Sequence, residues 1–241
     1  MSRRFTKGLL PAVGALMELC YLSFYAVSPG PGEVLLFIAV NAATFALLSF
    51  LLWCLKADSS AYSGMLVPVV LFGILFRATL VPHGVVGSDD IYRYIWDGKV
   101  ASAGYNPFAF TPTDPHLAAL ATADLPSRVN HPELKSVYPA FAQLLFLGSH
   151  ALFGDAPWGM KLLLAAMDLL TVLFLWIFAR RRGSSLVPVI LYAWSPLPVL
   201  YFARDGHIDA LGIPFLVLAL WYFSTRKPLR GALASGLSAL A

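Results

Sequence analysis

The chain has 241 residues, of which 59% are hydrophobic and only 12% are charged, and its mean hydropathy is +0.72. This apolar share exceeds that of ordinary soluble domains and indicates an integral membrane protein. The net charge is only +4, and the basic residues cluster at the ends of apolar runs, which argues against nucleic-acid binding. Because Cys20 and Cys54 lie in separate apolar runs, neither a disulfide framework nor a thiolate metal cluster is expected.

Several apolar runs are long enough for membrane helices and predict an all-α, polytopic transmembrane bundle. A helical span needs about 20 mainly apolar residues. The basic N-terminus resembles a signal peptide, but it lacks a small-residue cleavage site, so it is predicted to be a retained first span. The chain stops inside an apolar run, so residues 1–241 are expected to be a single transmembrane domain that is incomplete at its C-terminus. The expected spans are roughly 8–27, 34–55, 64–82, 159–179, 185–203 and 209–224, with another run starting near 229.

The borderline run 136–154 decides the topology. If it spans, Arg180 to Arg182 lie on the same side as the long segment after residue 82; if it does not, all the basic clusters share one side. The positive-inside rule favours the second arrangement. We therefore predict a juxtamembrane or half-inserted helix at 136–154, within an outer loop, 83–158, of short helices. The short segment 204–209 shares its non-cytoplasmic face, and the chain is placed in the inner (plasma) membrane. The basic clusters are Arg3, Arg4 and Lys7; Lys56; Arg180, Arg181 and Arg182; and Arg226, Lys227 and Arg230.

The stretch "GSDDIYRYIWDGKV", residues 87–100, concentrates charge in this oily chain. In the simplest interpretation Ser88 caps a helix, and Asp89 and Asp90 interact with the exposed N–H groups of its first turn. Asp89 and Arg93 also stand four residues apart, in the favourable order of acid before base. This interpretation requires no function.

Two further features of the same stretch favour a functional site. The acid pair follows the end of a span by about six residues, which places its carboxylates at the membrane surface, where a lipid-linked head group would lie. At helical spacing, the polar residues occupy one face and Ile91 and Ile95 another, which predicts an amphipathic helix lying on the bilayer. Such a polar face combines carboxylates that can accept a proton with a base that can hold a phosphate. The face comprises Asp90, Arg93, Tyr94 and Asp97.

Three motifs carry a resemblance to a known enzyme class. "SDDIYRYIWDGKVASAGYNPF" resembles the signature of GT-C class, polyprenyl-phosphate-sugar-dependent glycosyltransferases, especially bacterial mannosyltransferase-like members. "HPELKSVYPAFAQLLF" is similar to their Tyr-Pro-Pro helix, with Ala140 replacing the second proline. "RDGHIDAL" resembles their Gly-His-Asn-Asp-Ala-Leu motif, with Ile208 in place of asparagine. The resemblance covers about residues 64–225. The first signature is filled by Asp90, Tyr92, Arg93, Tyr94, Trp96, Asp97 and Gly98, followed by Gly104, Asn106 and Pro107.

The resemblance implies inverting transfer of a sugar, with mannose favoured, from a polyprenyl phosphate to a hydroxyl of a glycan or glycolipid acceptor. A carboxylate would act as general base, Asp90 being slightly favoured over Asp89. Cations would neutralise the leaving phosphate. For Lys99 and Lys135 a plain solvated role stays equally open, and Asp209 could orient His207. The candidates for substrate binding are Arg93, Tyr94, Asp97, Lys99, His131, Lys135, Tyr138, Arg204, His207 and Asp209.

No cofactor and no essential metal are expected, because a monophosphate donor has less need of a divalent cation than a diphosphate. Within the spans, Asp168 is expected to pair with Lys161 or with another span, as a structural lock or as a direct participant. Arg77 is placed near a membrane interface. Four aromatic residues are interpreted as interfacial anchors: Trp96, Trp158, Trp194 and Tyr201.

Two other functions compete with catalysis. A transporter or flippase of lipid-linked sugars would require broken spans and repeated halves, and the sequence indicates neither. A noncatalytic membrane subunit that binds a glycolipid would need no general base. Replacing Asp89 and Asp90 therefore distinguishes the three functions, because catalysis needs a general base.

Overall fold

The computed structural model describes residues 3–27, 31–56, 65–85 and 87–241, and every regular element in this part of the chain is helical, as predicted. The side chains of residues 3–7, 31 and 56 lie outside the described part. The segment between α3 and α6 forms α4 (Asp90–Ser102), η3 (Pro115–Leu120) and α5 (Ala140–Phe153). The other elements are α1 (Arg3–Leu22), η1 (Ser23–Ala26), α2 (Pro31–Lys56), α3 (Leu66–Leu80), α6 (Pro157–Arg181), α7 (Val187–Ala193), α8 (Pro196–Pro198), η4 (Val199–Arg204), η5 (Ile208–Leu211), α9 (Ile213–Ser224) and α10 (Pro228–Ala239).

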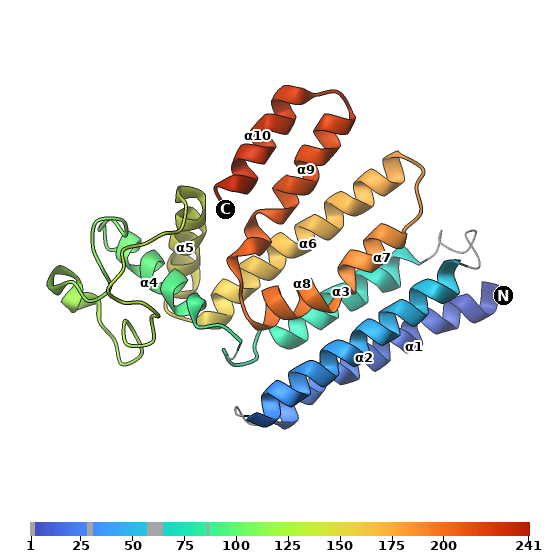
Figure 1. Ribbon diagram of the computed structural model, residues 1–241, viewed down its shortest axis with the longest axis horizontal. Helices are drawn as coiled ribbons and strands as arrows, with labels where there is room; N and C mark the ends of the chain where they lie inside the picture. Colours follow the sequence, from blue (N-terminus) through green and yellow to red (C-terminus); the bar gives the residue numbers. More distant parts are fainter. Residues whose placement is uncertain (1–2, 28–30, 57–64, 86) are drawn as a thin grey trace.

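The long helices lie side by side, and α4, α5 and the irregular chain between them gather at one end of the bundle (Figure 1). The opposite end carries the α6–α7 and α9–α10 turns. Helix α6 connects the two ends. It begins with Pro157 at its first position, where a missing N–H costs nothing, and ends with Arg180 and Arg181 next to the exposed carbonyls of its last turn.

Among the described residues, three helices are long and apolar enough to cross a membrane: Gly8–Ala26, Gly32–Leu55 and Pro157–Arg181. The span predicted at 64–82 is not among them: helix α3 has only 15 residues, about 22 Å at 1.5 Å per residue, against a hydrocarbon core of about 30 Å. Helix α5 has 14 residues and is likewise too short to span, which agrees with the non-spanning interpretation of 136–154.

The prediction of two unbroken spans at 185–203 and 209–224 is wrong. Val187–Arg204 and Ile208–Ser224 meet the criterion for a span only as a pair, bent by 112° at a short break. The sequence explains the irregular path, because Ser195 precedes Pro196 and adopts an extended conformation, as residues before proline tend to do. A π-helical turn follows at Val199–Arg204, and Gly206 then takes a φ of +77°, which favours glycine.

Helix α4 packs against α5 through a close contact at Gly98. A Cβ at this position would lie 2.2 Å from the carbonyl oxygen of Phe146, so only glycine fits. Tyr94 stacks on Phe146 with ring centroids 4.8 Å apart. The expected amphipathic helix with an open polar face is wrong, because every residue from Ile91 to Gly98 is buried within the protein. The segment 130–138 covers the polar face.

An ion pair between Arg77 of α3 and Asp168 of α6 is buried in the bundle. Arg77 Nε donates to Asp168 Oδ2 at 2.5 Å, and neither side chain is more than 1% exposed. Tyr192 of α7 donates its hydroxyl to Asp168 Oδ1 at 2.7 Å, and Arg77 also donates to the carbonyl of Ala193 at 2.9 Å. Placing Arg77 near an interface was therefore wrong. Of the two partners expected for Asp168, the structure selects another helix rather than Lys161.

Two of the four expected interfacial aromatics are core residues instead. Trp194 is fully buried, donates its indole N–H to the carbonyl of Val69 at 2.9 Å and meets Phe76 edge-on at 5.6 Å. Trp96 is 1% exposed. The interfacial interpretation is therefore wrong for Trp194 and Trp96, because packing against neighbouring helices buries both indoles. Trp158 and Tyr201 are exposed, as that interpretation requires.

Breaking the buried ion pair should destabilise the bundle. We expect Arg77→Met to lower the free energy of unfolding by about 3 kcal/mol or more, because it leaves the Asp168 carboxylate buried without its cation. The double variant Arg77→Met/Asp168→Leu should be less destabilised than the sum of the single variants. Unfolding in mixed micelles, followed by circular dichroism, measures both. A double variant whose loss equals that sum would show that the two charges do not depend on each other.

Candidate active site

The acid pair lies at the start of α4, directly after the turn that follows α3. The N–H of Asp90 donates to Ser88 Oγ at 3.3 Å, so Ser88 contributes to the cap as expected. Asp90 is the first residue of the helix and is half-buried, whereas Asp89 is exposed. Both residues stand at the start of the helix, where acidic side chains interact favourably with the exposed backbone N–H groups.

Asn130 joins the two carboxylates. Its Nδ2 donates to Asp90 Oδ1 at 2.6 Å and to Asp89 Oδ1 at 3.1 Å. The amide nitrogen carries two hydrogens and an ionised carboxylate only accepts, so one donor serves each acid. We refer to Asp89, Asp90 and Asn130 as the acid clamp. Asn130 was not among the residues predicted to form the site. The only local feature that pointed to it was its position next to His131, which was a predicted substrate-binding residue.

Two tyrosines lie next to the acid clamp. Tyr94 and Tyr138 meet edge-on with ring centroids 4.9 Å apart. Burial raises the pKa of the Tyr94 phenol, and the nearby Tyr138 and Asp90 raise it further. Burial also raises the pKa of Tyr138, with Asp90 acting in the same direction. Both phenols therefore stay protonated near neutral pH. Tyr94 is buried, whereas Tyr138 is half-buried, so of the two it is Tyr138 that a substrate could reach.

Arg93 and Asp97 form a buried pair on the same helix. Arg93 Nε donates to Asp97 Oδ1 at 2.9 Å, and Arg93 Nη1 donates to the carbonyl of Leu134 at 2.9 Å. Asp97 also accepts from Ser136 Oγ and from Gln143 Nε2, the latter at 3.0 Å. The expected pairing of Arg93 with Asp89 is absent. The network instead fastens the segment 130–138, and with it Asn130, onto α4 and α5.

Arg204 lies in a second buried cluster. It is 2% exposed, and its Nη2 and Nη1 donate to Glu33 Oε1 and Asp205 Oδ1, each at 2.6 Å. Its guanidinium also lies 4.6 Å from the ring centre of Phe24. Glu33 and Asp205 were not among the predicted site residues. Glu33 comes from α2 and lies 171 residues from Arg204, whereas Asp205 is its neighbour in the chain.

The two clusters are in contact. A Cβ on Gly87 would lie 2.3 Å from the Asp205 carboxylate, so the turn before Asp89 packs directly on Asp205. Lys161 of α6 donates to the carbonyl of His83 at 2.8 Å and so also holds the segment between α3 and Asp89. The pKa of Asp205 is raised, because burial outweighs the opposite effect of the surrounding positive groups. The contact between Gly87 and Asp205 brings together the outer loop 83–158 and the segment 204–209, which were expected to share a face.

The structure does not join the remaining predicted residues to the acid clamp by any hydrogen bond or ion pair of the described residues. Lys99 Nζ donates to Asp155 Oδ2 at 2.7 Å, so Lys99 is paired with a carboxylate and is not simply solvated. His131 and Lys135 are exposed, and Asp209 is also exposed. His207 is half-buried with its ring 5.0 Å from that of Tyr201. Among the hydrogen bonds of the described residues, none joins His207 to Asp209.

Arg128 is a cation that the sequence analysis missed. Arg128 stands two residues before Asn130 in the chain, and its guanidinium lies 4.5 Å from the ring centre of Tyr92. Within the described ranges, no three histidine, cysteine or acidic residues are grouped as a metal site would require.

Comparison with protein families gives an independent indication of function. Residues 136–228 match the family model described as dolichyl-phosphate-mannose-protein mannosyltransferase. The match covers less than half of the chain, from Ser136 through α5, α6 and the bent pair, and it excludes Asp89 and Asp90. It agrees with the GT-C resemblance of the sequence and supports a membrane glycosyltransferase in general. Comparisons with curated proteins and with solved structures gave no match.

Proposed function

We propose that this chain is a GT-C type glycosyltransferase that moves a sugar, with mannose favoured, from a polyprenyl phosphate to an acceptor hydroxyl on the non-cytoplasmic face. The observation that carries the proposal is the acid clamp, which places two carboxylates beside two protonated phenols. The family match supports the class of reaction, and the sequence resemblance supports the donor.

In the proposed mechanism the acceptor hydroxyl attacks the anomeric carbon of the donor sugar. Its proton passes to a carboxylate, the new glycosidic bond forms opposite the phosphate, and the sugar–phosphate bond breaks with its electron pair leaving on the phosphate. The configuration at the anomeric carbon is therefore inverted. Asn130 occupies Oδ1 of each acid, which leaves Oδ2 as the proton acceptor. We favour Asp90 as the base, because it is half-buried and lies near both phenols.

The proposed roles of the cations follow from their burial. Arg93 and Arg204 are buried and bonded to protein carboxylates, so we assign them, with Asp97, to positioning the site rather than to direct contact with phosphate. We leave contact with the leaving phosphate or with the acceptor to His207, which is half-buried, and to His131, Lys135 and Arg128, which are exposed.

A transporter of lipid-linked sugars is the second candidate. The 112° bend between Val187–Arg204 and Ile208–Ser224 is the kind of broken span that transporters use to build a site. A transporter would need Glu33, Arg204 and Asp205 at the break more than it would need the acid clamp. A noncatalytic glycolipid-binding subunit would need neither for chemistry.

Replacing the base should separate these functions. We expect Asp90→Asn to lower the rate of sugar transfer by about 100-fold or more, the range over which general-base catalysis acts, and Asp89→Asn to lower it less. The assay uses purified protein, a polyprenyl-phosphate-linked mannose and candidate acceptors. The control is Asp114→Asn, which replaces an acid of the same outer segment that is bonded to His116 and should leave the rate of sugar transfer unchanged. Unchanged transfer in both acid-pair variants would refute the catalytic assignment.

Asn130 should matter through its two N–H donors rather than through its shape. Asn130→Asp keeps the shape but replaces both donors with a third carboxylate, so we expect kcat to fall about tenfold or more while KM changes little. Asn106→Asp is the matched control, because Asn106 uses its side-chain oxygen to accept from the N–H of Phe108 and aspartate preserves that bond. Equal kcat values for the Asn130→Asp and Asn106→Asp proteins would contradict the clamp.

The face on which the site lies can be tested with introduced cysteines. In a chain without Cys20 and Cys54, Ala121→Cys should react with a membrane-impermeant thiol reagent on intact cells, and Ser184→Cys should react only after the membrane is opened. Both native residues are exposed in the structure, so access across the membrane decides the outcome. Labelling in the reverse order would overturn the proposed face.

A further inference from the structure

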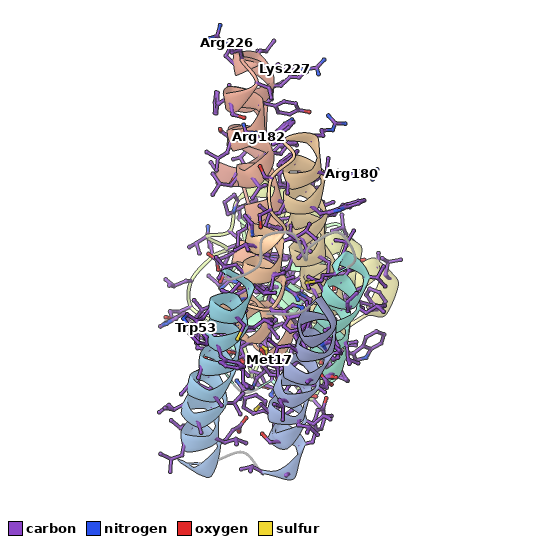
Figure 2. The ribbon with its side chains drawn as sticks, turned by 90° about the vertical axis from the view of Figure 1, so that its right-hand side faces the viewer. Met17, Trp53, Arg180, Arg182, Arg226 and Lys227 are labelled. Carbon is purple, nitrogen blue, oxygen red and sulfur yellow. The ribbon has the colours of Figure 1, made fainter. Side chains whose placement is uncertain are left out.

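The end of the bundle opposite the acid clamp carries a patch of unneutralised positive charge. Six cations lie in or beside the α6–α7 and α9–α10 turns, and all are exposed. The sequence contains no acidic residue in 169–204 or 210–241. Within the described residues, none of the six forms an ion pair. Figure 2 labels four of them at the upper end of the view. We call this patch the basic end; it comprises Arg180, Arg181, Arg182, Arg226, Lys227 and Arg230.

An apolar groove of about 290 Å³ opens beside the basic end, between α6, α7 and α9. Its walls come mainly from large apolar side chains, and its polar residues come from the ends of these helices. Such a combination suits a ligand with a long apolar part and a polar head. The apolar walls are Leu175, Phe178, Ala179, Pro188, Val217, Leu220 and Trp221, and the polar residues are Arg182, Ser184 and Ser224.

The side chain of Arg182 is held at this groove instead of extending freely into solvent. Its Nη2 donates to Ser224 Oγ, and its guanidinium lies 5.3 Å from the ring centre of Trp221. Trp221 in turn stacks on Phe178 with centroids 4.2 Å apart. The guanidinium is thus fixed on an aromatic wall, with N–H donors that meet no carboxylate of the described chain.

We propose that this groove binds one anionic membrane phospholipid. The phosphate lies against Arg182, whose planar guanidinium suits the bidentate binding of phosphate oxygens, with Ser184 and Ser224 as further donors. One acyl chain lies along the apolar wall formed by Val217 and Leu220. The surrounding cations of the basic end attract anionic lipid to this face of the bilayer.

Charge complementarity and the apolar walls together select this occupant. A free phosphate would use the cations but leave the groove empty, and a zwitterionic lipid would leave the basic end without a counter-charge. The inference needs only the membrane location of the helices and does not depend on the proposed sugar transfer. It therefore stands or falls separately from the acid clamp.

The test measures lipid binding to the purified full chain by native mass spectrometry in detergent micelles. Dioleoylphosphatidylglycerol should bind at least about tenfold more tightly than dioleoylphosphatidylcholine, since the two lipids share their chains and differ in net charge. Inorganic phosphate at millimolar concentration should not displace the bound lipid. Equal binding of the two lipids, or displacement by inorganic phosphate, would overturn the proposal. Tighter binding of a polyprenyl phosphate than of phosphatidylglycerol would overturn the choice of occupant.

Three variants locate the site. Arg182→Gln should weaken phosphatidylglycerol binding about fivefold or more by removing the fixed charge, and Ser184→Asp should do so by placing a negative charge at the exposed mouth. Arg180→Gln is the matched control, because Arg180 belongs to the same basic end and also lies over an aromatic ring, that of Trp176, but neither residue lines the groove. Ser184→Asp keeps the test decisive if Arg182→Gln does not fold. Wild-type affinity in a folded Arg182→Gln or Ser184→Asp protein, or an equal loss in Arg180→Gln, would contradict the site.

Discussion

A charge removed from water has to be paired, and this constraint organises the structure. Arg77 meets Asp168, Arg204 meets Glu33 and Asp205, and Lys161 meets backbone carbonyls of the turn after α3. Apart from the contact between the neighbouring residues Arg204 and Asp205, these contacts join elements that lie far apart in the sequence. An unpaired charge in an apolar bundle costs several kcal/mol, so the pairs restrict how the helices can be arranged. The helices of the bundle are therefore fixed both by apolar packing and by a few obligatory polar contacts.

The same constraint separates residues that build the site from residues that are left to meet a substrate. Arg93 and Asp97 are buried and bonded to each other, and through Leu134 and Ser136 they fix the segment that carries Asn130. Apart from Arg93 Nη2, the polar atoms of both side chains are hydrogen-bonded to the protein. The carboxylates of the acid clamp keep free oxygens, and the neighbouring phenols stay protonated. A site of this kind combines a rigid buried support with a small number of accessible groups, as preorganised chemistry requires.

Much of the local structure could be predicted from the sequence, and most of the long-range contacts could not. Apolar runs predicted the all-α bundle, and helical spacing predicted which residues of α4 share a face. Spacing cannot show what covers a face, so the burial of Arg93 and Asp97 under residues 130–138 was missed. Asn130 and Glu33 were missed for the same reason, because their partners lie about 40 and 171 residues away. The break before η5 was readable in principle, since Pro196, Pro198 and Gly206 interrupt an apolar run.

The central claim is that the acid clamp receives the acceptor hydroxyl on the side of the sugar opposite the phosphate. The most direct measurement is a cryo-EM structure of the protein with a non-hydrolysable polyprenyl phosphonate analogue of the donor. We expect the anomeric carbon to lie between the phosphonate and the clamp, with space for an acceptor oxygen about 2.6–3.2 Å from a free oxygen of Asp90 or Asp89. A sugar bound away from both carboxylates, or with its phosphonate directed at them, would contradict the account.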